Sequence, residues 1–195
     1  DIVTWLLFSA SGVIMFLSVT NIITYEITPI PLFWVIPLSI YLLSFVLCFK
    51  KNPWCPAWIK GKIHIITAFG ILLFFLSMRN TLPFIIEVAA YLAFLFIVCM
   101  FCNNELSLRR PQDAGSLTTF YLAVSAGGFI GGISLAWIIP IVSTSMIEYL
   151  IGLLAMFSAL SIGERSKNYD IYGIRLIFYS LCLIIIWPTI FKTYN

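Results

Sequence analysis

Three carboxylates stand where the chain enters or leaves apolar segments, in a pattern suited to cation binding. Glu26 follows the first apolar run, Glu87 lies about one turn inside a later run, and Glu148 stands near the start of another. An acid within an apolar span is costly and tends to face the interior of a helix bundle. Carboxylates beside aromatic faces can hold an organic cation through charge pairing and cation–π contact. The neighbouring candidates are Asn21, Tyr25, Trp34 and Tyr149.

An alternative reading of these acids needs no ligand. Arg79 lies on the same predicted side of the chain and can neutralise one of the carboxylates, while the others reach water. Both readings stay open at the level of the sequence.

A second polar group interrupts the apolar pattern in the stretch "NNELSLRRPQDAGSLTT". Glu105 and Arg109 are four residues apart, so they can pair if the preceding helix continues that far. With Arg110 they form either a solvated basic loop that touches lipid headgroups or a functional junction. The second reading includes a docking surface for a cytoplasmic domain.

The following segment, "SAGGFIGGISLA", is rich in glycine at helical spacing. Gly127 and Gly131 are four residues apart, and so are Gly128 and Gly132. Small residues at this spacing allow another helix to approach closely. No strand precedes the motif, so a phosphate-binding loop is not expected.

Other chemistry finds little support in the chain. One histidine, His64, cannot supply a Ser–His–Asp set, and no nucleotide-binding fingerprint is present. Cys99 and Cys102 form a C-x-x-C motif without a paired second motif, which predicts reduced thiols rather than a metal site. We therefore expect no catalysis, no cofactor and no bound metal.

The elements that position these residues are apolar segments long enough to cross about 30 Å of hydrocarbon. The composition agrees, because 62% of the 195 residues are hydrophobic and 10% are charged, against roughly 25% charged in soluble domains. We predict an all-α polytopic transmembrane helix bundle in a single domain, residues 1–195, with about seven spans. The expected spans are 2–24, 29–49, 63–78, 82–102, 120–142, 146–163 and 174–191.

The basic residues are distributed unevenly over the connections between these spans. The longer connections carry nine of the eleven lysines and arginines, and the opposite side has only Arg79 and Lys192. By the positive-inside rule the longer connections are cytoplasmic, which places the N-terminus in the cytoplasm. The net charge of +3 is too small and too dispersed to indicate nucleic-acid binding.

Two stretches are similar to a known family, the bacterial membrane proteins fused to a spermidine-synthase-like (aminopropyltransferase-like) domain, or fused MFS/spermidine synthase. "SVTNIITYEITPIPLFWVIPLSIYLLSFVLCF" and "CNNELSLRRPQDAGSLTTFYLAVSAGGFIGG" resemble two of its segments. The matching positions are Asn21, Trp34, Pro37, Tyr41, Glu105, Leu106, Arg110, Pro111, Leu117, Thr118, Phe120, Tyr121, Ser125, Gly127, Gly128, Gly131 and Gly132. The family has His-Gly where this chain has Asn103-Asn104, which puts any proton-handling role of that histidine in doubt.

The resemblance implies a membrane region without its enzyme. Because the chain begins with Asp1 and family members carry further helices and a soluble domain, we expect it to belong to a longer chain or a complex. The leading hypothesis is a non-catalytic module of the bacterial inner membrane that transports or senses a small, polyamine-like cation, or anchors a cytoplasmic domain. The alternative hypothesis is a structural subunit of a larger membrane complex. Expected partners are the lipid bilayer and other membrane subunits or a cytoplasmic domain.

Overall fold

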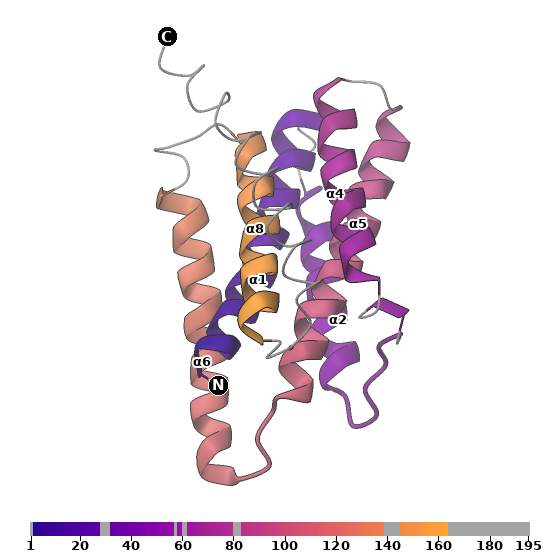
Figure 1. Cartoon of the computed structure of the whole chain (residues 1–195). Coiled ribbons are helices and arrows are strands. Elements are labelled where there is room, and N and C mark those ends of the chain that lie inside the picture. The colour runs from indigo at the N-terminus through magenta and orange to yellow at the C-terminus, as the bar shows by residue number, and fades with distance from the viewer. Residues whose placement is uncertain are drawn as a thin grey trace.

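The computed structural model describes residues 2–27, 32–56, 58–59, 62–79, 83–138 and 145–163, with the backbone alone at residues 25–27, 64, 78, 114, 138, 145–147 and 160–163. Every regular element in this part of the chain is a helix (Figure 1). In chain order they are α1 (Ile2–Asn21), η1 (Ile22–Ile27), α2 (Val35–Phe49), α4 (Ile63–Met78), α5 (Phe84–Leu108), α6 (Ala114–Ile133), η2 (Ser134–Ile138) and α8 (Ser145–Gly163).

The predicted all-helical architecture is confirmed over the described residues, but the predicted count of about seven spans is not supported there. By length and composition, three helical segments there can cross a membrane: Ile2–Thr24, Phe84–Leu108 and Gly115–Trp137. Three further helices are apolar but shorter: Val35–Phe49, Ile65–Ser77 and Glu148–Ala159. The expected span 174–191 lies outside the described residues, so the count of about seven stays a prediction.

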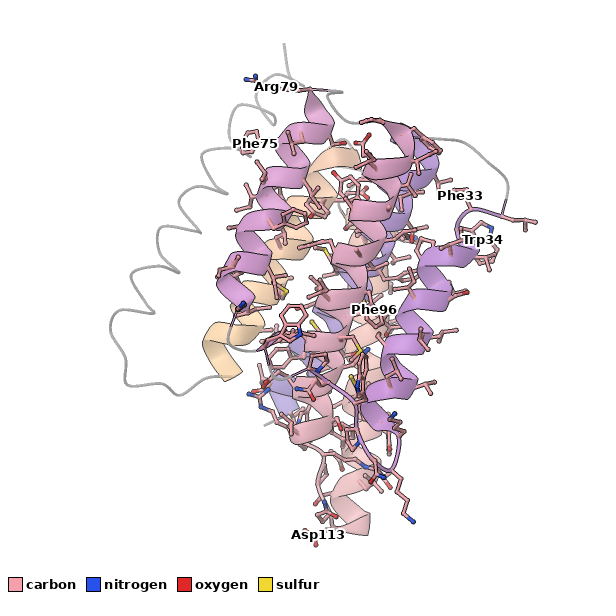
Figure 2. The ribbon with its side chains drawn as sticks, turned by 90° about the vertical axis from the view of Figure 1, so that its right-hand side faces the viewer. Phe33, Trp34, Phe75, Arg79, Phe96 and Asp113 are labelled. Atoms are coloured by element: carbon pink, nitrogen blue, oxygen red, sulfur yellow. The ribbon has the colours of Figure 1, made fainter. Side chains whose placement is uncertain are left out.

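The helices alternate in direction, and α1 lies at the centre of the bundle (Figure 1). It packs against α5, α6 and α8, while α2 and α4 pack on α5. Figure 2 shows Phe33, Trp34 and Arg79 at one end of the bundle and Asp113 at the other. We name these the acidic end, which carries Asn21, Glu87 and Glu148, and the basic end, which carries Lys50, Lys51, Arg109 and Arg110.

Polar side chains are buried in the bundle while large apolar side chains cover its outside. Ser11, Ser18 and Asn103 are all at most 4% exposed. This distribution suits a lipid environment, because lipid does not drive apolar side chains inward as water does. The outward apolar residues include Leu42 and Val46 on α2, Ile65 and Leu72 on α4, Ile85 on α5, and Leu122 and Phe129 on α6.

Several helix boundaries differ from those expected. α5 continues six residues past Cys102 to Leu108, because its last turns are held against α2 and by the Glu105–Arg109 pair. α6 begins six residues before Phe120, directly after Asp113, a residue type that favours helix starts. The expected span 29–49 corresponds to α2, which begins at Val35. Residues 28–31 lie outside the described part of the chain.

Candidate functional site

The end of α1 and the first turns of α5 and α8 bring polar residues together at the acidic end. Glu87 is 7% exposed and Glu148 is 5% exposed, although both stand close to a helix terminus. A carboxylate in the first turn of a helix is stabilised by the partial positive charge of the backbone N–H groups there. That local effect favours acids at these two positions, although both side chains are buried.

Glu148 is fixed by α1 through two hydrogen bonds. The Asn21 side chain donates from Nδ2 to Glu148 Oε2 at 2.7 Å, and the Ser18 hydroxyl donates to the Glu148 carbonyl at 3.1 Å. Ser18 also donates to Ile14 within its own helix at 2.7 Å. The candidate pair Asn21 and Glu148 therefore lies in direct contact, although 127 residues separate its members.

Two tyrosines frame the interior side of this cluster. The Tyr91 and Tyr149 rings meet edge to face, with centroids 5.6 Å apart, and the Tyr149 hydroxyl donates to the Gly70 carbonyl at 3.1 Å. Tyr91 lies one helical turn after Glu87 on α5, and Ser77 is buried near the end of α4, which packs against α5. The Tyr91–Tyr149 contact links the helices that carry Glu87 and Glu148. Carboxylates, an amide and phenols are groups that can bind an ammonium ion.

Tyr91 and Ser77 were not among the residues expected from the sequence. A signal for Tyr91 was present, because it lies four residues after Glu87 and so shares its helix face. Ser77 has no such signal, because its proximity depends on how α4 packs against α5.

Other expected members of the site lie elsewhere. Trp34 is 49% exposed and lies on the outer side of the start of α2, away from the cluster (Figure 2). The side chain of Glu26 lies outside the described residues. Arg79 is exposed, and no ion pair joins it to Glu87 or Glu148 among the described residues. Neutralisation of these two acids by Arg79, one of the readings left open, is therefore not seen there.

The residues of the basic loop divide into a paired and an exposed part. Glu105 is 3% exposed, and its Oε2 lies 2.8 Å from Nη1 of Arg109, the residue that follows α5. The Arg109 guanidinium also lies over the Phe8 ring, 4.9 Å from its centroid. Arg110 is exposed and lies 5.7 Å from the Tyr121 ring centroid. The pair joins α5 to α1, and Arg110 is left at the surface.

The glycines of α6 differ in what they face. A Cβ added to Gly127 would lie 2.5 Å from the Leu6 carbonyl oxygen, and one added to Gly131 would lie 2.7 Å from the Ala10 carbonyl oxygen. At Gly128 the nearest atom would be 3.5 Å away, and at Gly132 nothing lies within 4 Å. Gly127 and Gly131 therefore form the close contact with α1, and Gly132 faces open space.

The interface of α2 and α5 contains the position where this chain departs from the resembled family. Asn103 is buried, and its Nδ2 donates to Ser44 Oγ at 2.9 Å. Nearby, the Cys48 thiol contacts the Met100 carbonyl at 3.5 Å. Among the described residues no group of three metal-ligating side chains comes together.

Comparison with known proteins adds no relative to this description. No family model, no curated protein and no solved structure matches the chain. The likeness to spermidine-synthase-fused membrane proteins accordingly rests on the two sequence stretches alone.

Proposed function

We propose that the chain is a non-catalytic integral membrane module that binds a small organic cation at its acidic end. The observation that carries the proposal is the burial of Glu87 and Glu148 at one end of the bundle, with no basic partner among the described residues. Acids inside a membrane bundle are rare and typically belong to ligand or ion pathways. The resemblance to spermidine-synthase-fused proteins supports a polyamine-like cation.

The physical argument rests on the energy of buried charge. An uncompensated charge in a low-dielectric interior is destabilising by several kcal/mol, and one neutral amide from Asn21 compensates only part of it. An ammonium group supplies the opposite charge and several N–H donors to these carboxylates. Buried acids beside aromatic rings therefore favour an alkylammonium ligand over a fully hydrated metal ion.

The membrane orientation follows from charge asymmetry. The positive-inside rule supports placing the basic end in the cytoplasm and the acidic end outside, with a cytoplasmic N-terminus and about seven spans in a bacterial inner membrane. In that orientation the acidic end would bind cations from the periplasm. Transport, sensing and anchoring of a cytoplasmic domain all remain compatible with such a site.

The test is a titration of the purified protein in dodecyl maltoside with putrescine and with spermidine. Binding is measured by isothermal titration calorimetry. Glu148→Gln and Glu87→Gln remove one charge each without changing side-chain size. We expect each to weaken binding by about tenfold or more, as the loss of a charge-assisted hydrogen bond does. Asp113→Asn is the matched control, because this exposed acid lies at the opposite end of the bundle.

Two outcomes would contradict the proposal. Absence of any heat or thermal shift with both amines would remove the binding function. If Asp113→Asn weakened amine binding as much as the two glutamate variants, binding would depend only on the overall charge of the protein. Glu87 and Glu148 could then not be assigned as the binding site.

A second candidate function, a structural subunit of a larger membrane complex, is favoured by the exposed face of α6. Among the described elements α6 packs chiefly on α1. α6 also carries exposed Leu122 and Phe129, and Trp137 is exposed in η2, which follows it. Such a face can contact lipid or another subunit. Native mass spectrometry from the membrane would separate the two functions, since a stable hetero-complex is required only by the second.

A further inference from the structure

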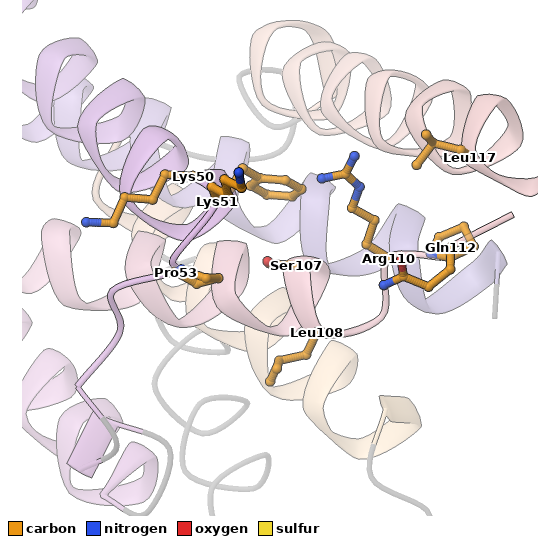
Figure 3. Close-up of a pocket in the computed structure, with 10 residues that line it drawn as sticks. Lys50, Lys51, Pro53, Ser107, Leu108, Arg110, Gln112 and Leu117 are labelled. Carbon is orange, nitrogen blue, oxygen red and sulfur yellow. The ribbon is translucent and has the colours of Figure 1, made fainter. Parts of the chain in front are cut away.

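A cavity of about 520 Å³ lies at the basic end, and Figure 3 shows the residues that line it. It forms where the ends of α2 and α5 meet the beginning of α6. The Ser107 hydroxyl donates to the Cys48 carbonyl at 2.9 Å and joins the ends of α5 and α2. The Arg110 backbone N–H donates to the Ser107 carbonyl at 3.3 Å, which turns the chain toward α6. These contacts give the cavity a defined wall.

The lining of the cavity is strongly positive. Lys50, Lys51 and Arg110 line it, and none of the described lining residues is acidic. Arg110 extends from its loop toward the side of the cavity that Lys51 lines (Figure 3). Two acids stand close to this loop in sequence: Glu105 pairs with Arg109, and Asp113 is exposed and does not line the cavity. Lys50 extends away from Arg110 in Figure 3, so Lys51 and Arg110 are the cations that face each other across the cavity. Like charges repel each other, and a bound anion would relieve that repulsion.

The remaining lining makes the cavity amphipathic. Phe49, Leu108 and Leu117 supply apolar walls, and Leu108 is 66% exposed. Trp54 and Trp58, in the connection that follows Pro53, are also exposed, as is usual for side chains at headgroup depth. A cavity that is lined by both cationic and apolar side chains and lies beside such tryptophans fits an anionic amphiphile better than a free inorganic ion. Its volume lies within the usual range of small-ligand pockets.

We propose that this cavity binds the phosphate headgroup of an anionic phospholipid from the leaflet at the basic end. Lys51 and Arg110 contact the phosphate, Ser107 and Gln112 offer polar contacts to the headgroup, and Phe49 with Leu108 lies along the first carbons of the acyl chains. The site is independent of the cation site, since it occupies the opposite end of the bundle. Lipid bound there would hold the ends of α2, α5 and α6 together.

The experiment titrates the purified protein in dodecyl maltoside with short-chain lipids, using native mass spectrometry to count bound molecules. Dioctanoyl phosphatidylglycerol is the anionic probe, dioctanoyl phosphatidylcholine is the zwitterionic control, and inorganic phosphate tests for a free-anion site. Arg110→Gln and the double variant Lys50→Gln/Lys51→Gln remove lining charges. Lys62→Gln is the matched control, because this exposed cation at the start of α4 does not line the cavity.

We expect phosphatidylglycerol to bind the wild type and the Lys62→Gln variant equally, and to bind the Arg110→Gln variant about tenfold more weakly. The double lysine variant should lose at least as much. Equal binding by Arg110→Gln and Lys62→Gln would overturn the site. Equal affinity for phosphatidylcholine, or displacement of the lipid by inorganic phosphate at matched concentration, would overturn the assignment to an anionic lipid. All four altered side chains are exposed, so the variants are expected to fold.

Discussion

The contact between α6 and α1 allows a sharp test, because neighbouring glycines of one helix face different surroundings. We expect Gly127→Ala and Gly131→Ala to destabilise the bundle, and Gly132→Ala to leave it unchanged or slightly more stable. All three substitutions replace glycine by alanine within the same helical stretch, so the gain in helix propensity, up to about 1 kcal/mol, is shared. The difference between them then reports the contact with α1.

The magnitude follows from the distances. A Cβ at Gly127 meets the Leu6 carbonyl oxygen at 2.5 Å and the Leu6 Cα at 3.0 Å, whereas ordinary contacts begin at 3.4 Å. Relief requires the two helices to separate locally by roughly 1 Å, which weakens the surrounding van der Waals contacts by a quarter to a half. The backbone cannot rotate away as a side chain can. We therefore expect Gly127→Ala to be about 2 kcal/mol less stable than Gly132→Ala.

The Ser9 hydroxyl adds to this effect. It donates to the Val124 carbonyl at 2.6 Å, across the same helix pair. A separation of the helices lengthens that bond, and bonds of this kind contribute about 0.6 kcal/mol on average in membrane bundles. We therefore expect Gly127→Ala to weaken both the helix contact and this hydrogen bond.

The assay is reversible unfolding in dodecyl maltoside micelles by increasing mole fractions of sodium dodecyl sulfate, followed by circular dichroism. Wild type, Gly127→Ala, Gly131→Ala and Gly132→Ala are compared under identical conditions. If Gly127→Ala and Gly132→Ala unfold at the same mole fraction, the close approach of α1 and α6 is not a determinant of stability and the reasoning is refuted.

Two further predictions concern the connections between helices. Leu32 has a positive φ of 71°, so Leu32→Gly should raise the free energy of unfolding by up to about 1 kcal/mol; a loss of stability in the same detergent titration would contradict the strain. Burial, with a smaller contribution from the Glu105 carboxylate, raises the pKa of the Cys55 thiol above 9.0. Less thiolate is then present at any given pH, so N-ethylmaleimide should modify Cys55 more slowly than the same peptide in unfolded protein between pH 7 and 9, as followed by peptide-resolved mass spectrometry. Equal rates would contradict this shift.

Much of the helical pattern was readable from the residues. The apolar run 63–78 coincides with α4, and the runs at 2–24 and 146–163 match α1 with the start of η1 and α8 to within a few residues. The boundaries near Cys102 and Phe120 were misjudged. Polar residues such as Asn103 and Ser107 look like a loop in sequence, yet they bond to Ser44 and the Cys48 carbonyl and continue the helix.

The candidate residues divide in the same way. The spacing of Glu105 and Arg109 predicted a pair across one helical turn, conditional on the helix extending that far, and the structure has that pair at 2.8 Å. The glycine spacing in α6 predicted a close helix contact without saying which face makes it. Local periodicity fixes which side chains share a face, but it does not identify the partner of that face.

The sequence by itself determined that the chain is helical, strongly apolar, and asymmetric in charge between its two ends. These are local properties, since they follow from side-chain hydropathy and from the need of the backbone to bond internally in lipid. Only the tertiary structure decided that Asn21 reaches Glu148, that Trp34 stays outside, and that Lys50, Lys51 and Arg110 line one cavity. Those proximities depend on how helices far apart in the chain pack together, and packing is a property of pairs of surfaces rather than of any single segment.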